Sequence, residues 1–316
     1  MAEPVDLDLS AFAPQIVDKV LRLLGVLDAI GGDRMLASKV CLHGGTALNL
    51  FILDAPRLSV DIDLNYIGST NLAQMQAQRP TLEQALINVT ENLGFDVAAG
   101  KPEHSGRSFR LYYQGAHGRD WVKIDLDYLN RSPLLPAAPQ TIRLATGATV
   151  QFLLNSDTEL VAGKTKALIE RVAVRDLYDI SRLACLVPTL FARDDEKLSR
   201  RVLLYYLSMS APFPRPFRIA DRFGNREADL AAQLYPMLRP TDRPTLDALI
   251  ATAEEYLTNV SQPHDDDEAE YLARAARADF APELLFADYP DALIAARADP
   301  AAQWKMRNLA KSLLAE

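Results

Sequence analysis

Two acidic residues, Asp61 and Asp63, alternate with apolar residues between positions 60 and 64. This alternation is typical of a strand with one buried face, and residues two apart in a strand point to the same side. The two carboxylates therefore leave one face together, where they repel each other unless a cation lies between them. Mg2+ prefers oxygen ligands and is commonly held by one or two carboxylates together with phosphate oxygens. The run thus predicts a site for Mg2+, or Mn2+, and a phosphorylated substrate.

A glycine pair lies upstream of the acidic run. Gly44 and Gly45 follow a strand-like apolar run, 39–42, and Thr46 opens a helix predicted to reach residue 53. Glycine lets the backbone approach a phosphate closely, and a helix N-terminus presents N–H groups to an anion. Each motif alone is weak evidence, but the order strand, Gly-Gly, helix, Asp-x-Asp strand predicts a nucleoside triphosphate site. The P-loop and dinucleotide patterns are both absent.

The composition of the 316-residue chain is that of an ordinary globular protein, with 49% hydrophobic and 24% charged residues. Only two cysteines occur, which argues against a disulfide framework. The acidic N-terminal decapeptide does not have the layout of a signal peptide, and no apolar run reaches membrane-spanning length. We therefore expect a cytoplasmic protein without a membrane partner. The net charge of −8 argues against broad nucleic-acid coating.

The spacing of apolar residues along the sequence changes near residue 155. Before it, alternation predicts strands over 108–114 and 121–129 and a hairpin over 142–154, besides helices over 8–30 and 69–93, the second interrupted near Pro80. After it, apolar spacing is almost wholly helical. The expected fold class is α+β, with one domain over 1–155 and an all-helical domain over 156–316.

The two opening motifs carry a family resemblance. The run 44–50, followed by Arg57-x-Ser59-x-Asp61-x-Asp63, resembles the DNA polymerase β nucleotidyltransferase superfamily and, more narrowly, the AbiEii toxins of type IV toxin–antitoxin and abortive-infection systems. The gap between the motifs is longer than in the minimal superfamily pattern and usual for the AbiEii branch. The resemblance implies a polymerase β-like nucleotidyltransferase domain with a mixed sheet, followed by a helical domain.

A third carboxylate is expected on a later strand, because two-metal phosphoryl transfer usually needs one. Asp125 and Asp127 share a strand face in the run 121–128. By resemblance, Asp125 is the better match for the third acid, which would bind the catalytic metal and help deprotonate the attacking hydroxyl. Asp127 is then a supporting group or a solvent-facing residue.

Two arginines, a lysine and a serine are candidates for contacts with the triphosphate. Arg57 could reach the triphosphate or lie on the surface, and Ser59 shares the strand face of Asp61. A phosphoryl group on Ser59 would place about two negative charges beside the acids and impair metal or nucleotide binding. Lys164 and Arg171 share one face of a predicted helix, from which they could contact triphosphate oxygens.

The same helical region is similar to the AbiEii signature of a lysine helix followed by Arg-Asp-Leu-Tyr-Asp, here 175–179. Lys164 matches the family lysine. Asp179 is expected at the nucleotide site, where it or Asp176 could fix Lys164 or Arg171. The alternative for these acids is a structural ion pair between helices.

The function implied by the resemblance is transfer of a nucleoside monophosphate from an NTP to the 3′ end of tRNA, which would block aminoacylation. An arginine- and aromatic-rich stretch, 200–226, is a candidate tRNA surface. The family also implies a cognate antitoxin encoded nearby. Three alternatives remain open: a protein or small-molecule acceptor, a catalytically silent interaction protein on the same fold, and a glycosyltransferase, in which the Gly-Gly-Thr motif would have no place.

Overall fold

The computed structural model describes residues 4–116, 118–192 and 195–314, which divide into two compact units. The sheet unit comprises the chain up to Asn155 and the segment Pro236–Asp242, and the helical unit comprises Ser156–Tyr235 and the chain from Arg243 onward. The predicted domains, 1–155 and 156–316, do not provide for this return segment. Their outermost residues, 1–3 and 315–316, lie outside the described residues.

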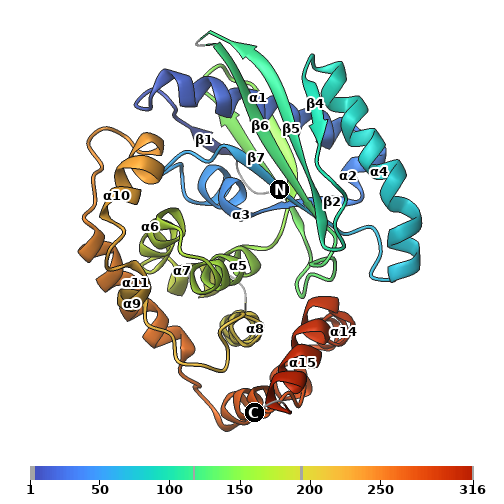
Figure 1. Cartoon of the computed structure of the whole chain (residues 1–316), viewed down its shortest axis with the longest axis vertical. Coiled ribbons are helices and arrows are strands. Elements are labelled where there is room, and N and C mark those ends of the chain that lie inside the picture. The colour runs from blue at the N-terminus through green and yellow to red at the C-terminus, as the bar shows by residue number, and fades with distance from the viewer. Residues whose placement is uncertain (1–3, 117, 193–194, 315–316) are drawn as a thin grey trace. The chain divides into compact units, whose positions relative to one another are not determined.

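Within the described residues, the sheet unit contains one mixed sheet of eight strands (Figure 1). Strands β2 and β3 are antiparallel, β3 and β6 are parallel, and β6 pairs antiparallel with β5. A mixed sheet accompanied by many helices is the α+β class predicted from the sequence. In spatial order the strands are β1 (Val5–Leu7), β7 (Ala138–Leu144), β8 (Thr149–Leu154), β2 (Val40–His43), β3 (Asp61–Tyr66), β6 (Gly118–Asp127), β5 (Gly106–Gly115) and β4 (Asp96–Ala99).

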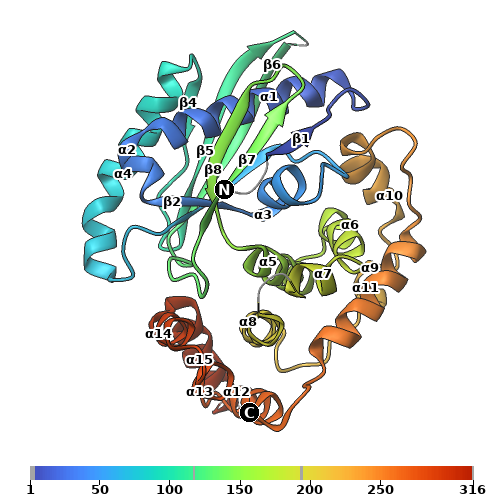
Figure 2. The same ribbon diagram turned by 180° about the vertical axis from the view of Figure 1, so that it is seen from behind.

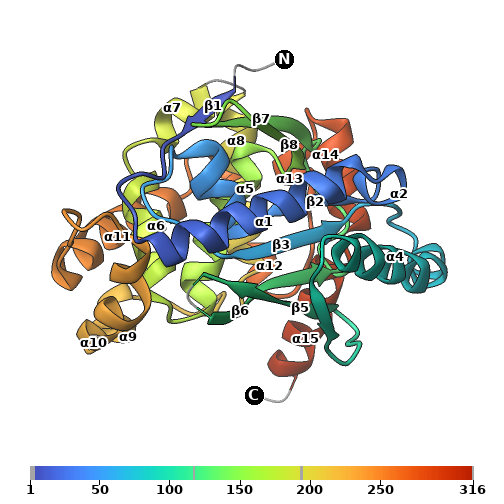
Figure 3. The ribbon, with the colours of Figure 1, turned by 90° about the horizontal axis from the view of Figure 1, so that it is seen from above.

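Two long helices, α1 (Pro14–Gly32) and α4 (Leu72–Asn92), cover one face of this sheet (Figure 3). Phe152 of β8 lies against Gly31 of α1. The strand register places Leu64 of β3 on that same face, where it is fully buried. Because successive strand residues alternate between faces, the acidic residues of β3 lie on the opposite face.

Helix α4 runs without interruption through Pro80, so the predicted break there is wrong. A proline inside a helix removes one hydrogen bond and costs about 3 kcal/mol. Met75, Leu82 and Leu86, on either side of the proline, are all buried. Burial of a large apolar side chain contributes roughly 1.5–3 kcal/mol, so packing on both sides of Pro80 outweighs the local penalty.

The helical unit is built around α5 (Asp157–Glu170), which packs beside α6 (Val174–Leu183) and α8 (Glu196–Ser208) (Figure 2). Ser156 caps α5 by accepting a hydrogen bond from the backbone N–H of Glu159, which satisfies a donor left free at the helix start. None of the helices in the described ranges combines the length and the apolar composition of a bilayer crossing. The other helices of this unit are α7 (Val187–Ala192), α9 (Ile219–Phe223), α10 (Glu227–Asp229), α11 (Leu246–Ser261), α12 (Asp266–Ala276), α13 (Glu283–Phe286), α14 (Pro290–Ala298) and α15 (Pro300–Leu313).

Candidate active site

A row of polar residues crosses four adjacent strands on the face of the sheet opposite α1. In the β3–β6 ladder Asp63 lies opposite Asp125, and in the β5–β6 ladder Ser108 lies opposite Asp125. On the other side of β3, His43 of β2 lies opposite Asp63. Neighbouring strands are about 4.8 Å apart, so adjacent members of such a row are within reach of one another. The register thus brings together the second predicted acid and the third.

The next row along the same face contains Asp61 and two cationic residues. Asp61 lies opposite Lys123 of β6, which in turn lies opposite Arg110 of β5. Lys123 Nζ pairs with Asp125 Oδ2 at 2.5 Å, and Ser108 Oγ donates a hydrogen bond to Asp125 Oδ1, also at 2.5 Å. Both oxygens of the third acid are therefore engaged. Neither Lys123 nor Ser108 is among the predicted site residues.

The carboxylates of this face suit a divalent cation in donor type and in register. Asp61, Asp63 and Asp125 come from two adjacent strands and offer only oxygen, the donor that Mg2+ prefers. Among the residues that the structure describes, no three His, Cys, Asp or Glu side chains form a group that could hold a metal ion. In the structure, the Asp125 carboxylate contacts Ser108 and Lys123.

Asp127 has a structural task in this arrangement. Its carboxylate accepts hydrogen bonds from the backbone N–H groups of Leu129 (2.5 Å) and Asn130 (3.0 Å) and from the side chain of Asn130 (2.9 Å). It therefore fixes the turn that follows β6. Asp125, rather than Asp127, is the acid that lies opposite Asp63.

The glycine pair packs directly against the acidic face. Gly44 has a φ of +72°, which favours glycine, and a Cβ at this position would overlap Asp63 Oδ2. A Cβ on Gly45 would lie 3.0 Å from both Arg57 Nη2 and Ser59 Oγ. Gly44 is thus required by conformation and by close approach, Gly45 is tightly packed, and three predicted site residues, Asp63, Arg57 and Ser59, contact this turn.

The helix predicted over 46–53 is a short turn followed by a wide helix. Gly44–Thr46 forms α3, and Ala47–Ile52 forms the π-helix η1. The Thr46 hydroxyl is fully buried and donates a hydrogen bond to the carbonyl oxygen of Asp61. This side chain fastens the glycine turn to β3, so any phosphate contact of Thr46 would have to come from its backbone N–H.

Arg57 is buried, with 3% of its surface exposed, so the surface alternative for this residue is wrong. Its Nη1 donates to the carbonyl oxygen of Leu58 at 3.0 Å, and the residue forms a β-bridge with Leu238. The backbone N–H of Leu58 donates to the carbonyl oxygen of Met237 at 2.8 Å. The return segment Pro236–Asp242 therefore holds the arm that carries Arg57 and Ser59, a contact that sequence pattern did not indicate.

The remaining predicted residues form an ion cluster inside the helical unit. This cluster is buried except for Arg171, whose side chain is 64% exposed. Lys164 Nζ lies 2.9 Å from both Asp176 Oδ1 and Asp179 Oδ2, and Arg171 Nε lies 2.5 Å from Asp176 Oδ2. Lys164, Asp176 and Asp179 are each at most 5% exposed. Burial alone would raise the pKa of Asp176, but the charge of Lys164 and the hydrogen bonds from Arg171 hold it below its usual value. The cluster joins α5 to α6.

The arginine-rich stretch is only partly available to a ligand. Arg200 pairs with Glu268 at 3.1 Å, and the buried Arg201 pairs with Asp265 at 3.0 Å. These two arginines therefore have structural partners, and the prediction that they contact tRNA does not fit their burial. Arg215 and Arg218 of the same stretch are exposed.

The comparisons with known proteins agree with this architecture. MenT4, a nucleotidyltransferase toxin from Mycobacterium tuberculosis H37Rv, has a solved structure that matches with a TM-score of 0.54 at 17% identity, over 84% of this chain and 94% of that one. JHP933 from Helicobacter pylori matches with a TM-score of 0.48 at 15% identity, over 79% and 93%. No curated protein matches. The match to MenT4 shows that this chain shares the α+β fold of that toxin.

The family follows from a second comparison. The family model described as nucleotidyl transferase AbiEii toxin, type IV TA system, matches residues 26–308. The chain belongs to this AbiEii family, which confirms the resemblance carried by the glycine pair, the acidic strand and the lysine helix.

Replacing Gly44 by Ala should disturb the acidic face directly. A left-handed conformation costs an L-residue about 1–2 kcal/mol, and the added methyl would also displace the Asp63 carboxylate. Gly147 is the matched control, since its φ is +84° and nothing lies within 4 Å of a Cβ there. In urea unfolding, Gly44→Ala should lower the free energy of unfolding by about 1–3 kcal/mol, more than Gly147→Ala. Equal losses for the two variants would contradict the packing of Gly44 on Asp63.

Proposed function

We propose that this protein is an NTP-dependent nucleotidyltransferase whose reaction takes place on the acidic face of β3 and β6. The observation that carries this proposal is the register that sets Asp63 opposite Asp125, beside a glycine turn that packs on Asp63. A glycine turn at the start of a helix can present backbone N–H groups to phosphate, and paired carboxylates suit the cation that accompanies it.

The residues have distinct roles in this proposal. Gly44, Gly45 and the N–H of Thr46 hold the triphosphate, with Arg57 and Ser59 behind the turn. Asp61, Asp63 and Asp125 would hold Mg2+ or Mn2+, which when bound would offset the charge of the phosphates. Asp125 accepts the proton of the acceptor hydroxyl while the oxygen of that hydroxyl forms a bond to the α-phosphorus. The bond from the α-phosphorus to the bridging oxygen breaks, and pyrophosphate leaves with that electron pair.

The acceptor in this proposal is the 3′ end of tRNA, an assignment that rests on the family. A protein or small-molecule acceptor is the alternative outcome of the test. Lys164, Arg171 and Asp179 keep their predicted role toward the triphosphate as part of the proposal, with Asp176 holding Lys164. The family further supports a cognate antitoxin as partner.

The test incubates the purified protein with Mg2+, total tRNA and each α-labelled NTP in separate reactions, with Asp61→Ala as control. The proposal expects label on tRNA with the wild type alone, from one or few of the four nucleotides. Pyrophosphate release with label on protein or on a small molecule would keep the chemistry and overturn the tRNA acceptor. Absence of label and of pyrophosphate in every reaction would overturn the proposed function.

A further inference from the structure

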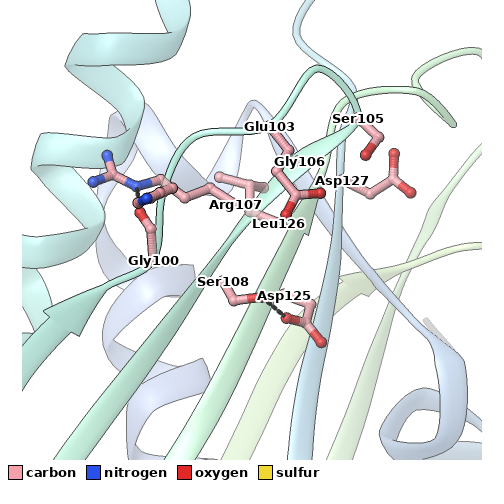
Figure 4. A pocket seen from close by; sticks show the side chains of 10 residues that line it. Gly100, Glu103, Ser105, Gly106, Arg107, Ser108, Asp125, Leu126 and Asp127 are labelled. Carbon is pink, nitrogen blue, oxygen red and sulfur yellow. Dashed lines mark hydrogen bonds between the residues drawn. The ribbon is translucent and has the colours of Figure 1, made fainter.

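A cavity of about 310 Å³ opens beside Asp125 at the end of β6 (Figure 4). Its wall is the loop between β4 and β5, with Gly100, Glu103 and Ser105, together with the start of β5. Ser108 and Asp125 line it from adjacent strands, and their side chains point toward each other. The cavity thus reaches the third acid of the acidic face from the side of β5.

The wall of this cavity is tied to helix α4. Arg79 of α4 donates to the carbonyl oxygens of Glu103 at 2.7 Å and of Gly106 at 3.0 Å. Arg107 donates to the carbonyl oxygen of Gly100 at 2.8 Å and pairs with Glu83 of α4 at 2.7 Å. Charge-assisted hydrogen bonds of this kind are about twice as strong as neutral ones. The loop is therefore held in place, and the cavity is preformed.

The hydrogen bond from Ser108 fixes one oxygen of Asp125 and leaves the other to a cation. Ser108 Oγ donates a hydrogen bond to Asp125 Oδ1, whereas Asp125 Oδ2 is paired with the ammonium group of Lys123. The side chain of Lys123 is one-third exposed. Ion pairs near the surface contribute little free energy, so another cation can replace Lys123 at Asp125 at a small energetic cost. Ser108 is held opposite Asp125 by the backbone ladder, and its hydroxyl needs only to rotate about one bond.

We propose that Ser108 is a positioning residue for Asp125, which it presents with Oδ2 directed to a cation at the mouth of the cavity. The proposal rests on the proposed function and adds to it the cavity as the entry of the acceptor hydroxyl. Lys123 is the cation at Oδ2 in the structure described here. A divalent ion and the acceptor would take its place during turnover.

Three variants test this assignment through two readouts, the Kd of Mn2+ by electron paramagnetic resonance in the presence of an NTP analogue and the kcat of transfer. Ser108→Ala removes the donor and should weaken Mn2+ binding and lower kcat, each about tenfold, with the KM for NTP little changed. A hydrogen bond to a charged group supports a change of this size. Ser108→Thr keeps the hydroxyl on a strand residue and should restore both values. Thr149→Ala removes an exposed hydroxyl on β8 and should leave the Kd of Mn2+ and kcat at their wild-type values.

A double-mutant cycle separates positioning from a general effect on the fold. In an Asp125→Asn background, Ser108→Ala should no longer change the Kd of Mn2+, because its action passes through the Asp125 carboxylate. An undiminished effect in that background, or a Ser108→Ala variant equal to the wild type, would overturn the proposal while the proposed function stands. A wild type that neither binds Mn2+ nor transfers a nucleotide would overturn both.

Discussion

Asp63→Asn should lower the rate of nucleotidyl transfer by about 1000-fold while the protein remains folded. The change keeps the size of the side chain and removes a charge next to Asp125 and under the glycine turn. A cation at a phosphoryl-transfer site supplies several kcal/mol of charge stabilisation, and each 1.4 kcal/mol is a factor of ten in rate. The measurement is single-turnover transfer from labelled NTP, with unfolding in urea as the check on folding.

The matched control for Asp63 is Asp96→Asn. Asp96 is also an aspartate on a strand of this sheet, but its side chain is 77% exposed and pairs with the exposed Arg119. Its replacement should leave transfer within twofold of the wild type, since exposed ion pairs contribute little. If Asp63→Asn retained more than a tenth of the wild-type rate, the acidic face of β3 would not be the reaction site.

The second large effect is expected on stability, at the buried ion cluster of the helical unit. Asp176→Asn removes the carboxylate that Lys164 and Arg171 share, while the ion pair of Lys164 with Asp179 remains. Breaking a buried ion pair from one side costs about 3–5 kcal/mol, and the remaining partner reduces this to about 2–4 kcal/mol. Urea unfolding at pH 7 measures the loss directly.

The same cluster gives this stability a pH dependence. The pKa of Asp176 is lower in the folded protein than in the unfolded chain, where a carboxyl of this kind titrates near 3.9. Its contribution is therefore complete above that unfolded value and is lost as the pH falls toward the folded pKa. The difference in unfolding free energy between the wild type and Asp176→Asn should accordingly be constant from pH 6 to 8 and shrink below about pH 4.

An exposed pair provides the comparison for that result. Asp279 forms two hydrogen bonds with Arg274 on the surface of the helical unit. Asp279→Asn should leave the urea midpoint unchanged at pH 7. Should Asp176→Asn behave in the same way, the ion cluster would contribute little to the stability of the helical unit.

Sequence pattern was sufficient for the parts of the site that depend on local order. Alternation over residues 60–64 gave the shared face of Asp61 and Asp63, and the glycine pair marked the turn that packs on them. The pairing of Gly115 with Gly118 also marks the β5–β6 register. From that register the pairing of Ser108 with Asp125 follows, so this contact was within reach of the sequence.

Contacts between distant segments were beyond pattern for a physical reason. The choice between phosphate contact and ion pair for Lys164 depends on how α5 packs on α6, which helical periodicity does not encode. The break predicted at Pro80 failed because burial on both sides of the proline outweighs a local preference. Similarly, burial of Arg57 depends on a partner, Leu238, that no local motif announces.

The bridge between Arg57 and Leu238 sets an order on synthesis. The two residues are about 180 positions apart, and at about 5–20 residues per second a ribosome needs roughly 10–35 s to cover that interval. From the synthesis of Asp125 until that of Leu238, a nascent chain holds all three aspartates and the glycine turn but lacks the segment that supports their arm. A fragment ending near residue 155 would remain in that state permanently. In this member of a toxin family, the sheet unit can therefore be completed only after about three-quarters of the chain has been synthesised.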